Sequence, residues 1–369
     1  MDIDLRGPGS AAYSLGMEPS GREHAVIVVK RRLSFPMENG GTCTWSDAAP
    51  GLTTADIFAG DPNTSATLAE SDFALRKPAC DVLLYGAAHA PGGRPVTQLH
   101  ATMKVAGKLK SVLVFGNRVW ERTMIGPMAS DPEPFLRQEV TYDHAFGGAD
   151  VGEEEEDGID LYRDNPAGKG WARRRSRGLI DGMPLPNLED SDNLVAAPWN
   201  ECRPMAFGAV GRSWPIRARW GGTYDDAWLA DRFPFLPDDF DDRYYQAAPP
   251  DQQIRHPVGG EEIVLNNLME GQSGPFQMRL PALDLPVVVG RHRAEDATPN
   301  TVCDTLTILP EERAIDVVTR AAVPLARDIL ELKEAIIGRR GRGFWRARAL
   351  GKRYNSGLRH IGRAEVPRL

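Results

Sequence analysis

The chain has 369 residues, of which 41% are apolar and 26% charged, a balance typical of a globular protein with a full hydrophobic core. Its 37 Gly and 29 Pro indicate many turns and short elements, which favours strands over helices. The formal net charge of −7 argues against a nucleic-acid platform, and the chain shows neither an export signal nor an apolar run of membrane-spanning length. We therefore expect a cytoplasmic protein without a membrane partner.

Cysteine usage agrees with that compartment. The four cysteines are widely spaced and form no Cys-x-x-Cys pair. This spacing predicts buried free thiols in a reducing cytoplasm. The residues are Cys43, Cys80, Cys202 and Cys303.

Strand patterns dominate the first third of the chain. Residues 25–33 (AVIVVKRRL) form a first apolar strand, and residues 80–86 (CDVLLYG) form another. Residues 97–106 alternate apolar and polar side chains, which predicts a half-buried strand, and residues 111–115 and 118–122 follow after short glycine turns. Because short turns join neighbouring strands, we expect these last four segments to form one β-meander.

A stretch from Phe207 to Gln252 concentrates aromatic residues. It holds more than a third of the chain's Phe, Trp and Tyr residues, set among Pro and Asp with no clean period of 2 or 3.6. Residues 225–233 have its best helical pattern, with Asp225 or Asp226 as N-cap and Trp228 packing inward. Because exposed apolar patches stay small, we expect about two-thirds of the rings to be core and the rest to face a partner.

The last third predicts more strands, a helix and a basic tail. The strands are expected at residues 261–266, 276–280, 287–291, 302–309 and 314–319. Residues 324–338 place apolar side chains at i, i+4, i+7 and i+11, which predicts an amphipathic helix with Arg327 and Glu331 as an exposed ion pair. From Arg339 onward there are ten Lys or Arg and one acid, which gives this tail a net charge of +9. Residues 1–338 therefore carry a net charge of −16, so the chain has an acidic body and a basic tail.

These patterns together predict a mainly β fold, with antiparallel meanders packed as a sandwich or partial barrel and long irregular loops. A short helix near residues 225–233 and a C-terminal helix near 324–338 complete it. We expect a β-rich domain over residues 1–322, with a split into two packed sub-domains near 150–200 as an open alternative. The helix and basic tail would occupy residues 323–369.

Catalytic and metal-binding signatures are missing. The sequence has no GxxxxGK[ST], GxSxG or HExxH motif, so we expect no cofactor, no metal site and no enzymatic activity. The acidic run at residues 238–242 lacks the spacing and Gly of a calcium loop, which favours a solvated turn. The alternative is a loop-based hydrolase that uses Asp143 and His144 with Asn165 and Lys169, because an imidazole can act as a base near neutral pH.

The basic tail leaves a further alternative open. Residues 338–354 interleave Arg with Phe344 and Trp345, a pattern suited to stacking on single-stranded nucleic acid. A solvated tail, or one docked on an acidic partner, is the preferred interpretation.

Short motifs in a fixed order run from Lys77 to Pro310. They are KP (77–78), DVL (81–83), APGGRPV (90–96), FGNR (115–118), TYDHAFGG (141–148), NP and GKG (165–170), LPN (185–187), GTYD with Trp228, Pro237 with DFD (239–241), AAPPDQ (247–252), LNNL (265–268) and DT (304–305). In number and order they resemble the bacterial domain of unknown function 2169 family, which is encoded beside type VI secretion effectors and spike proteins.

The resemblance implies a non-enzymatic accessory role. An adaptor or chaperone of this kind would bind a type VI effector and help load it onto the spike protein of the valine-glycine repeat type or its tip. The family often continues into pentapeptide repeats, which this chain lacks, and it offers no catalytic residue to transfer. Because Trp, Tyr and Arg dominate interface energetics, the candidate partner-binding residues are Trp214, Arg217, Arg219, Trp220, Tyr224, Phe235, Tyr244, Tyr245, Arg346 and Arg348.

Overall fold

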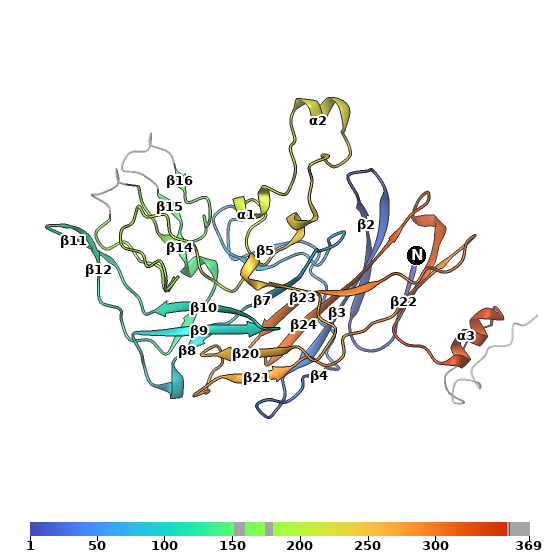
Figure 1. The fold of residues 1–369 in the computed structure, drawn as a ribbon, viewed down its shortest axis with the longest axis horizontal. Coiled ribbons are helices and arrows are strands. Elements are labelled where there is room, and N and C mark those ends of the chain that lie inside the picture. Colours follow the sequence, from blue (N-terminus) through green and yellow to red (C-terminus); the bar gives the residue numbers. More distant parts are fainter. Residues whose placement is uncertain (151–158, 174–179, 353, 355–369) are drawn as a thin grey trace, which may run out of the picture.

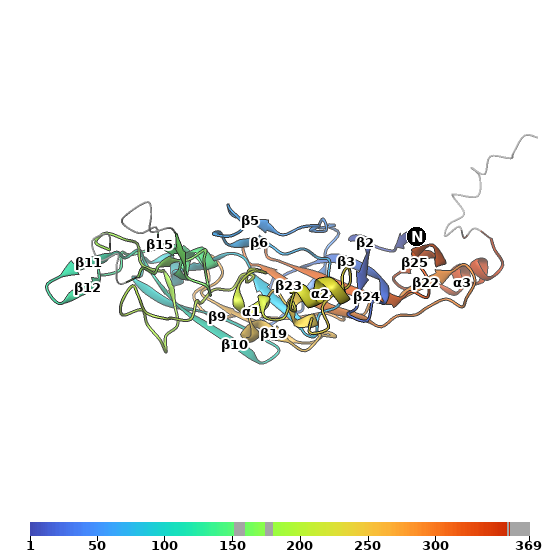
Figure 2. The same cartoon turned by 90° about the horizontal axis from the view of Figure 1, so that it is seen from above.

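The chain forms an elongated, mainly β molecule, as the sequence predicts. The computed structural model describes residues 1–150, 159–173, 180–352 and 354. A seven-stranded, a five-stranded and a three-stranded sheet make up most of it, joined by long loops and two-stranded ribbons. A ribbon around residues 120–129 lies at one end and the C-terminal helix lies at the other (Figures 1 and 2).

The seven-stranded sheet runs through the middle of the molecule. In spatial order it contains β19 (Gln253–Ile254), β7 (Cys80–Leu84), β23 (Thr301–Leu309), β24 (Ala314–Pro324), β3 (Glu23–Ser34) and β2 (Ser10–Met17), with β4 (Thr44–Trp45) paired to β3. Neighbours are antiparallel except β7 and β23, which are parallel. The apolar run of β3 is buried on both faces because its alternate side chains enter different core clusters.

The five-stranded sheet packs against the large sheet and makes the main core. It contains β18 (Leu188–Glu189), β10 (Lys108–Phe115), β9 (Gln98–Val105), β20 (Glu262–Asn266) and β21 (Phe276–Arg279). The alternating pattern of β9 buries Leu99, Ala101, Met103 and Val105 in one cluster with apolar side chains of β23 and β24. Two sheets that share a core in this way form the predicted sandwich.

The three-stranded sheet extends the molecule beyond this sandwich. It contains β1 (Asp2–Leu5), β25 (Leu332–Ile337) and β22 (Val287–Arg291), with β1 parallel and β22 antiparallel to β25. Its apolar side chains pack with Ala25, Ile27 and Val29 of β3 in a second core cluster.

The helix predicted near residues 324–338 is wrong. That segment contains the end of β24, a 3-10 turn at Ile329–Glu331 and β25. Leu332 and Ile336 fit a helical period, but they are buried in a strand that two other strands hold in place. The Arg327–Glu331 ion pair expected on the helix is also absent, because the Glu331 carboxylate accepts backbone N–H groups of Ala326 and Arg327 instead.

The predicted meander between residues 80 and 122 is only partly formed. β9 and β10 make an antiparallel hairpin, as expected. β7 belongs to the other sheet, and β11 (Trp120–Thr123) pairs with β12 (Gly126–Ala129) in a separate ribbon. Segments adjacent in sequence therefore go to three different sheets, because β7 takes the remote partners β19 and β23, while β9 with β10 and β11 with β12 form local hairpins.

The remaining elements are short. The strands are β5 (Ile57–Phe58), β6 (Thr67–Ala69), β8 (Ala87–His89), β13 (Arg137–Glu139), β14 (Phe146–Gly147), β15 (Ala149–Asp150), β16 (Asp160–Leu161) and β17 (Lys169–Gly170). The α-helices are α1 (Pro215–Ala218), α2 (Asp226–Asp231) and α3 (Arg342–Ala349). α2 confirms the helix predicted near 225–233, and Asp225 caps it by accepting the Trp228 N–H at 2.8 Å.

Two further predictions can be compared with the structure. All four cysteines are free and buried, as predicted. Within the part of the chain that the structure describes, no helix has the length and apolar character needed to cross a membrane. The proposed domain division near residue 322 stays a prediction.

Candidate partner-binding surface

The aromatic stretch at residues 207–252 leaves the body of the protein and returns to it. We call this segment the aromatic arm, with a root (207–217 and 244–252) in the body and a tip (222–240) that carries α2. In Figure 1 the tip stands above the sheets, between α1 and β2. The root and the tip are held by different kinds of contact.

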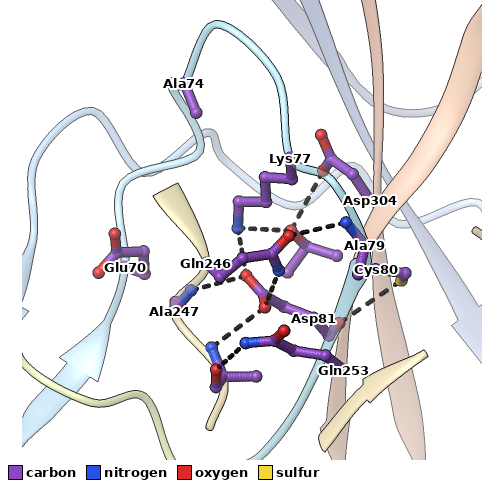
Figure 3. A network of polar contacts seen from close by, with 12 residues as sticks. Glu70, Ala74, Lys77, Ala79, Cys80, Asp81, Gln246, Ala247, Gln253 and Asp304 are labelled. Carbon is purple, nitrogen blue, oxygen red and sulfur yellow. Dashed lines mark hydrogen bonds and ion pairs between the residues drawn. The ribbon is translucent and has the colours of Figure 1, made fainter. Parts of the chain in front are cut away.

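The root is fixed by a buried carboxylate on the large sheet. Asp81 of β7 is 0% exposed, and its oxygens accept from Gln246 Nε2 at 2.6 Å, Ala247 N at 2.8 Å and Ala248 N at 3.1 Å. Lys77 Nζ lies 2.7 Å from the same carboxylate, so the buried charge is paired (Figure 3). The first two residues of the AAPPDQ motif, Ala247 and Ala248, are thus held by their backbone N–H groups to the Asp81 carboxylate.

A buried amide closes the root at its other end. Gln252 Nε2 donates to the carbonyl oxygens of Val82 at 2.7 Å and Phe207 at 2.8 Å, so it joins the two ends of the aromatic arm to β7. Its Oε1 accepts from Lys110 Nζ at 2.7 Å, and Lys110 also contacts Asp251 at 3.2 Å. Burial lowers the pKa of Lys110 to about 8.

Arg217 ties the outgoing and returning halves of the arm together. Its guanidinium donates to the Val210 carbonyl at 2.9 Å and to the Tyr244 carbonyl at 3.0 Å, and it pairs with Glu70 at 2.9 Å. Arg217 is only 2% exposed and Trp214 is only 3% exposed. Both were candidates for partner binding, and the structure places both side chains in the interior, where Arg217 holds the arm.

Above the root, two limbs of the arm are cross-linked. Thr223 donates to the Asp239 carboxylate from its backbone N at 2.9 Å and its Oγ1 at 2.7 Å. Trp220 is half-buried between two guanidiniums, with Arg243 at 3.3 Å and Arg219 at 4.8 Å from its ring centroid. The other carboxylates of residues 238–242 also have partners in the protein: Asp238 pairs with Arg232, Asp241 with Arg243 and Asp242 with Arg76.

The tip is built around Trp228. The rings of Tyr224 and Phe233 meet this indole edge to face at 4.8 and 5.7 Å, and its Nε1 donates to the Phe235 carbonyl at 2.9 Å. Arg232 donates to the Pro19 carbonyl in the turn between β2 and β3, which rests the tip on that hairpin. The tip is thus internally braced although it stands outside the sheets.

The tip exposes four large apolar side chains among exposed aspartates. Tyr224 is 57% exposed, Leu229 60%, Phe233 62% and Phe235 41%. These four side chains, which we call the tip patch, come from twelve consecutive residues on one braced loop. Large exposed apolar groups that lie together on a rigid support are typical of protein-interaction sites.

The prediction that two-thirds of the arm's rings are core is wrong. Only Phe207 and Trp214 are fully buried. Tyr224, Phe233 and Phe235 are exposed, and the other five rings, Trp220, Trp228, Phe240, Tyr244 and Tyr245, are half-buried. Trp228 does not pack into the body as expected but forms the centre of the tip itself.

The two predicted partner-binding arginines of the tail, Arg346 and Arg348, differ in exposure and in their contacts. Arg348 on α3 is bound by the carboxylates of Asp296 and Glu334, so the body already occupies its guanidinium. Arg346 is exposed on the same helix. The tail positions 353 and 355–369 lie outside the described residues.

The alternative catalytic residues are brought partly together. His144 Nδ1 lies 3.0 Å from Gln138 Nε2, 3.2 Å from Asn187 Oδ1 and 3.4 Å from Lys169 Nζ. Burial lowers the pKa of Lys169. Asn165 has a structural task, because its Nδ2 donates to the carbonyl oxygens of Tyr142 at 2.8 Å and Phe146 at 3.0 Å. The Nδ1 atom of His144 is therefore surrounded by protein groups.

Some exposed residues escaped the sequence prediction. Leu229 and Phe233 were not among the predicted partner-binding residues, although both belong to the tip patch. Met124 is 105% exposed and Ile125 is 89% exposed at the turn of the β11–β12 ribbon, a second apolar projection at the far end of the molecule. The sequence signal for this projection was the apolar pair Met124 and Ile125, because turns usually carry polar residues.

Comparison with known proteins assigns the chain to a family. No curated protein and no solved structure matches it. The sequence model of a family described as an uncharacterized protein conserved in bacteria matches residues 20–320, which include the five-stranded sheet, the seven-stranded sheet except β2 and the end of β24, and the whole aromatic arm. The chain therefore belongs to the DUF2169 family.

Proposed function

We propose that this chain is a non-enzymatic adaptor or chaperone, which binds a type VI secretion effector in the cytoplasm and helps load it onto the spike protein. The observation that carries the proposal is the tip patch, four exposed apolar side chains on a loop that the fold holds away from the sheets. The type VI assignment comes from the motif resemblance and the choice of a protein partner comes from the patch.

The arm suits client binding because it is ordered before the client arrives. Its root is anchored to Asp81, its limbs are joined by Thr223 and Asp239, and its tip is organised by Trp228. A patch that is already rigid loses little conformational entropy on binding, so more of the buried apolar area contributes to affinity. The tip would cover apolar effector surface until the effector reaches the spike.

The proposal is tested by co-expression with the effector encoded beside this chain. Leu229→Ser with Phe233→Ser removes two exposed side chains of the tip patch, and gel filtration then reports whether the two proteins still co-elute. We expect loss of the complex and of effector solubility, with a fall of only a few degrees in the melting temperature of the adaptor, because the packing lost is one edge-to-face contact with Trp228. Met124→Ser with Ile125→Ser removes two still more exposed apolar side chains from the other projection and serves as the matched control.

The outcomes separate the possibilities clearly. If the tip variant captures the effector as well as the wild type does, the tip is not the client site. If the wild-type chain neither co-elutes with the effector nor changes its solubility, the adaptor proposal itself fails. Loss of binding in the control alone would transfer the client site to the ribbon.

Hydrolysis at His144 is the second candidate, favoured by the 3.4 Å approach of Lys169 Nζ to the imidazole. Asp143 Oδ1 is buried and has no hydrogen-bond partner among the described residues. Asp143→Asn with His144→Gln should then abolish secretion while effector binding stays intact. Unchanged secretion by this double variant would remove the candidate.

A further inference from the structure

A pocket at the end of the molecule opposite the β11–β12 ribbon gathers cationic side chains. It lies between the loop that follows β22 and the loop that follows β24, with a volume of about 690 Å³, within the usual size range of small-molecule sites. A backbone hydrogen bond of 3.0 Å from His292 N to the Glu331 carbonyl holds the two loops together. Arg291, His292 and Arg293 line one side and Arg327 lines the other.

The guanidiniums in this pocket are largely unpartnered. Arg293 and Arg327 are exposed, and neither side chain has a hydrogen-bond or ion-pair partner among the described residues. Arg291 donates from Nη2 to the Pro324 carbonyl at 3.3 Å, and its Nε is buried with no partner in the described part of the chain. A buried N–H donor without an acceptor costs stability, so an incoming oxygen ligand would be favoured here.

The two carboxylates at the pocket are already engaged by their own loop. Asp328 Oδ1 accepts from Leu330 N at 2.8 Å. The Glu331 oxygens accept from Ala326 N at 3.1 Å and from Arg327 N at 3.2 Å. Three guanidiniums against two carboxylates leave an excess of positive charge, in a chain whose net charge is −7.

We propose that this pocket binds a phosphoryl group, carried by a small molecule or by a lipid headgroup. A single carboxylate can be satisfied by one guanidinium in a two-pronged contact, whereas three guanidiniums from separate backbone positions match the several oxygens and double charge of a phosphate. His292 adds an imidazole N–H donor to the same pocket. This pocket shares no residue with the tip patch, and the proposal does not depend on client binding.

The first test is a calorimetric titration of the whole chain with sodium phosphate at pH 7.5 and constant ionic strength. Arg293→Gln with Arg327→Gln removes the two exposed guanidiniums without touching a core residue. We expect at least tenfold weaker phosphate binding in this variant. Arg342→Gln with Arg346→Gln removes the same charge from exposed positions of α3 and should bind phosphate as the wild type does.

The second arm identifies the source of the phosphoryl group. Vesicles of phosphatidylcholine, with and without phosphatidic acid, are sedimented with the three proteins. Sedimentation that needs phosphatidic acid, Arg293 and Arg327 would assign a lipid headgroup, and binding of free phosphate alone would assign a soluble ligand. Absence of binding in both arms, equal losses in the two double variants, or acetate bound as tightly as phosphate would overturn the proposal.

Discussion

The root and the tip of the aromatic arm belong to one stretch of chain but are built on opposite principles. The root buries charge: Asp81, Lys77, Arg217 and Lys110 are all nearly inaccessible, and each is matched by a partner. The tip exposes apolar rings on a frame of backbone caps and edge-to-face contacts. The aromatic side chains of this stretch therefore pack into the interior at the root, whereas those of the tip do not.

The difference shows how a projecting loop can be held rigid. Few apolar side chains of the tip reach the core, so hydrophobic burial cannot fix its direction. Buried hydrogen bonds and ion pairs have strict geometry, and Asp81, Gln252 and Arg217 use them to set where the arm leaves and re-enters the body. The root supplies orientation and the tip supplies the surface.

The strongest test of this division is Asp81→Asn at the root. The substitution keeps the shape but leaves the Lys77 ammonium buried without its counter-charge, so we expect a loss of about 3–5 kcal/mol of unfolding free energy. Urea denaturation followed by tryptophan fluorescence measures it. A loss below about 1 kcal/mol would mean that the network does not anchor the arm.

The next test compares two arginines that are two residues apart. Arg217→Met removes the buried link between the limbs and should cost about 2–3 kcal/mol, because it leaves the Val210 and Tyr244 carbonyls without a donor. The loss is smaller than at Asp81 because Glu70 keeps an ion pair with Arg212 at 2.6 Å. Arg219→Met, on the exposed side, should change stability by less than about 0.5 kcal/mol. Equal losses in the two variants would contradict the assignment.

A third test uses the pH dependence of the root. The pKa of Lys110 is about 8 in the folded chain, against 10.5 for an ordinary lysine. Between these values the unfolded chain binds more protons, so the Lys110 contribution makes stability rise with pH. From pH 7.5 to 9.5 the wild type should gain about 2 kcal/mol relative to Lys110→Met. Parallel stability curves for the two proteins would show that Lys110 is not buried as described.

The smallest stability effect is expected at the tip. Leu229→Ser with Phe233→Ser removes exposed side chains, and the packing it loses is the edge-to-face contact of Phe233 with Trp228, so unfolding free energy should fall by about 0.5–1.5 kcal/mol. Thermal denaturation of the purified variant measures this. A large loss would show that the tip patch is part of the fold, and its exposure would then need another explanation.

Local patterns in the sequence predict the strands well and their partners poorly. The apolar runs at residues 287–291 and 301–309 are strands at the predicted places. The segment 324–338 failed because its apolar spacing suits a helix, while β1 and β22, remote in sequence, hold it as a strand. Pairing of this kind has no local signal.

The candidate site shows the same limit. Aromatic density located the arm, and the helical pattern with its Asp225 cap located α2. Arg217 was expected to bind a partner because arginine is common among the residues that dominate interfaces, and its burial depends on Glu70, which lies 147 residues away in the chain. Which rings face solvent likewise depends on where the root is anchored to the body. Asp81, on β7 of the seven-stranded sheet, provides that anchor.

The pairing of β3 with β24 means that the seven-stranded sheet can be completed only late in synthesis of the chain. Val26 pairs with Ala322, so one edge of β3 stays open until almost the whole chain has been synthesised. At 5–20 residues per second the wait is roughly 15–60 s. During it, the AVIVV run offers an unpaired apolar edge, the kind of segment that starts aggregation. The Lys30-Arg31-Arg32 run that follows places three positive charges beside it, where gatekeeper residues oppose stacking of one nascent chain on another.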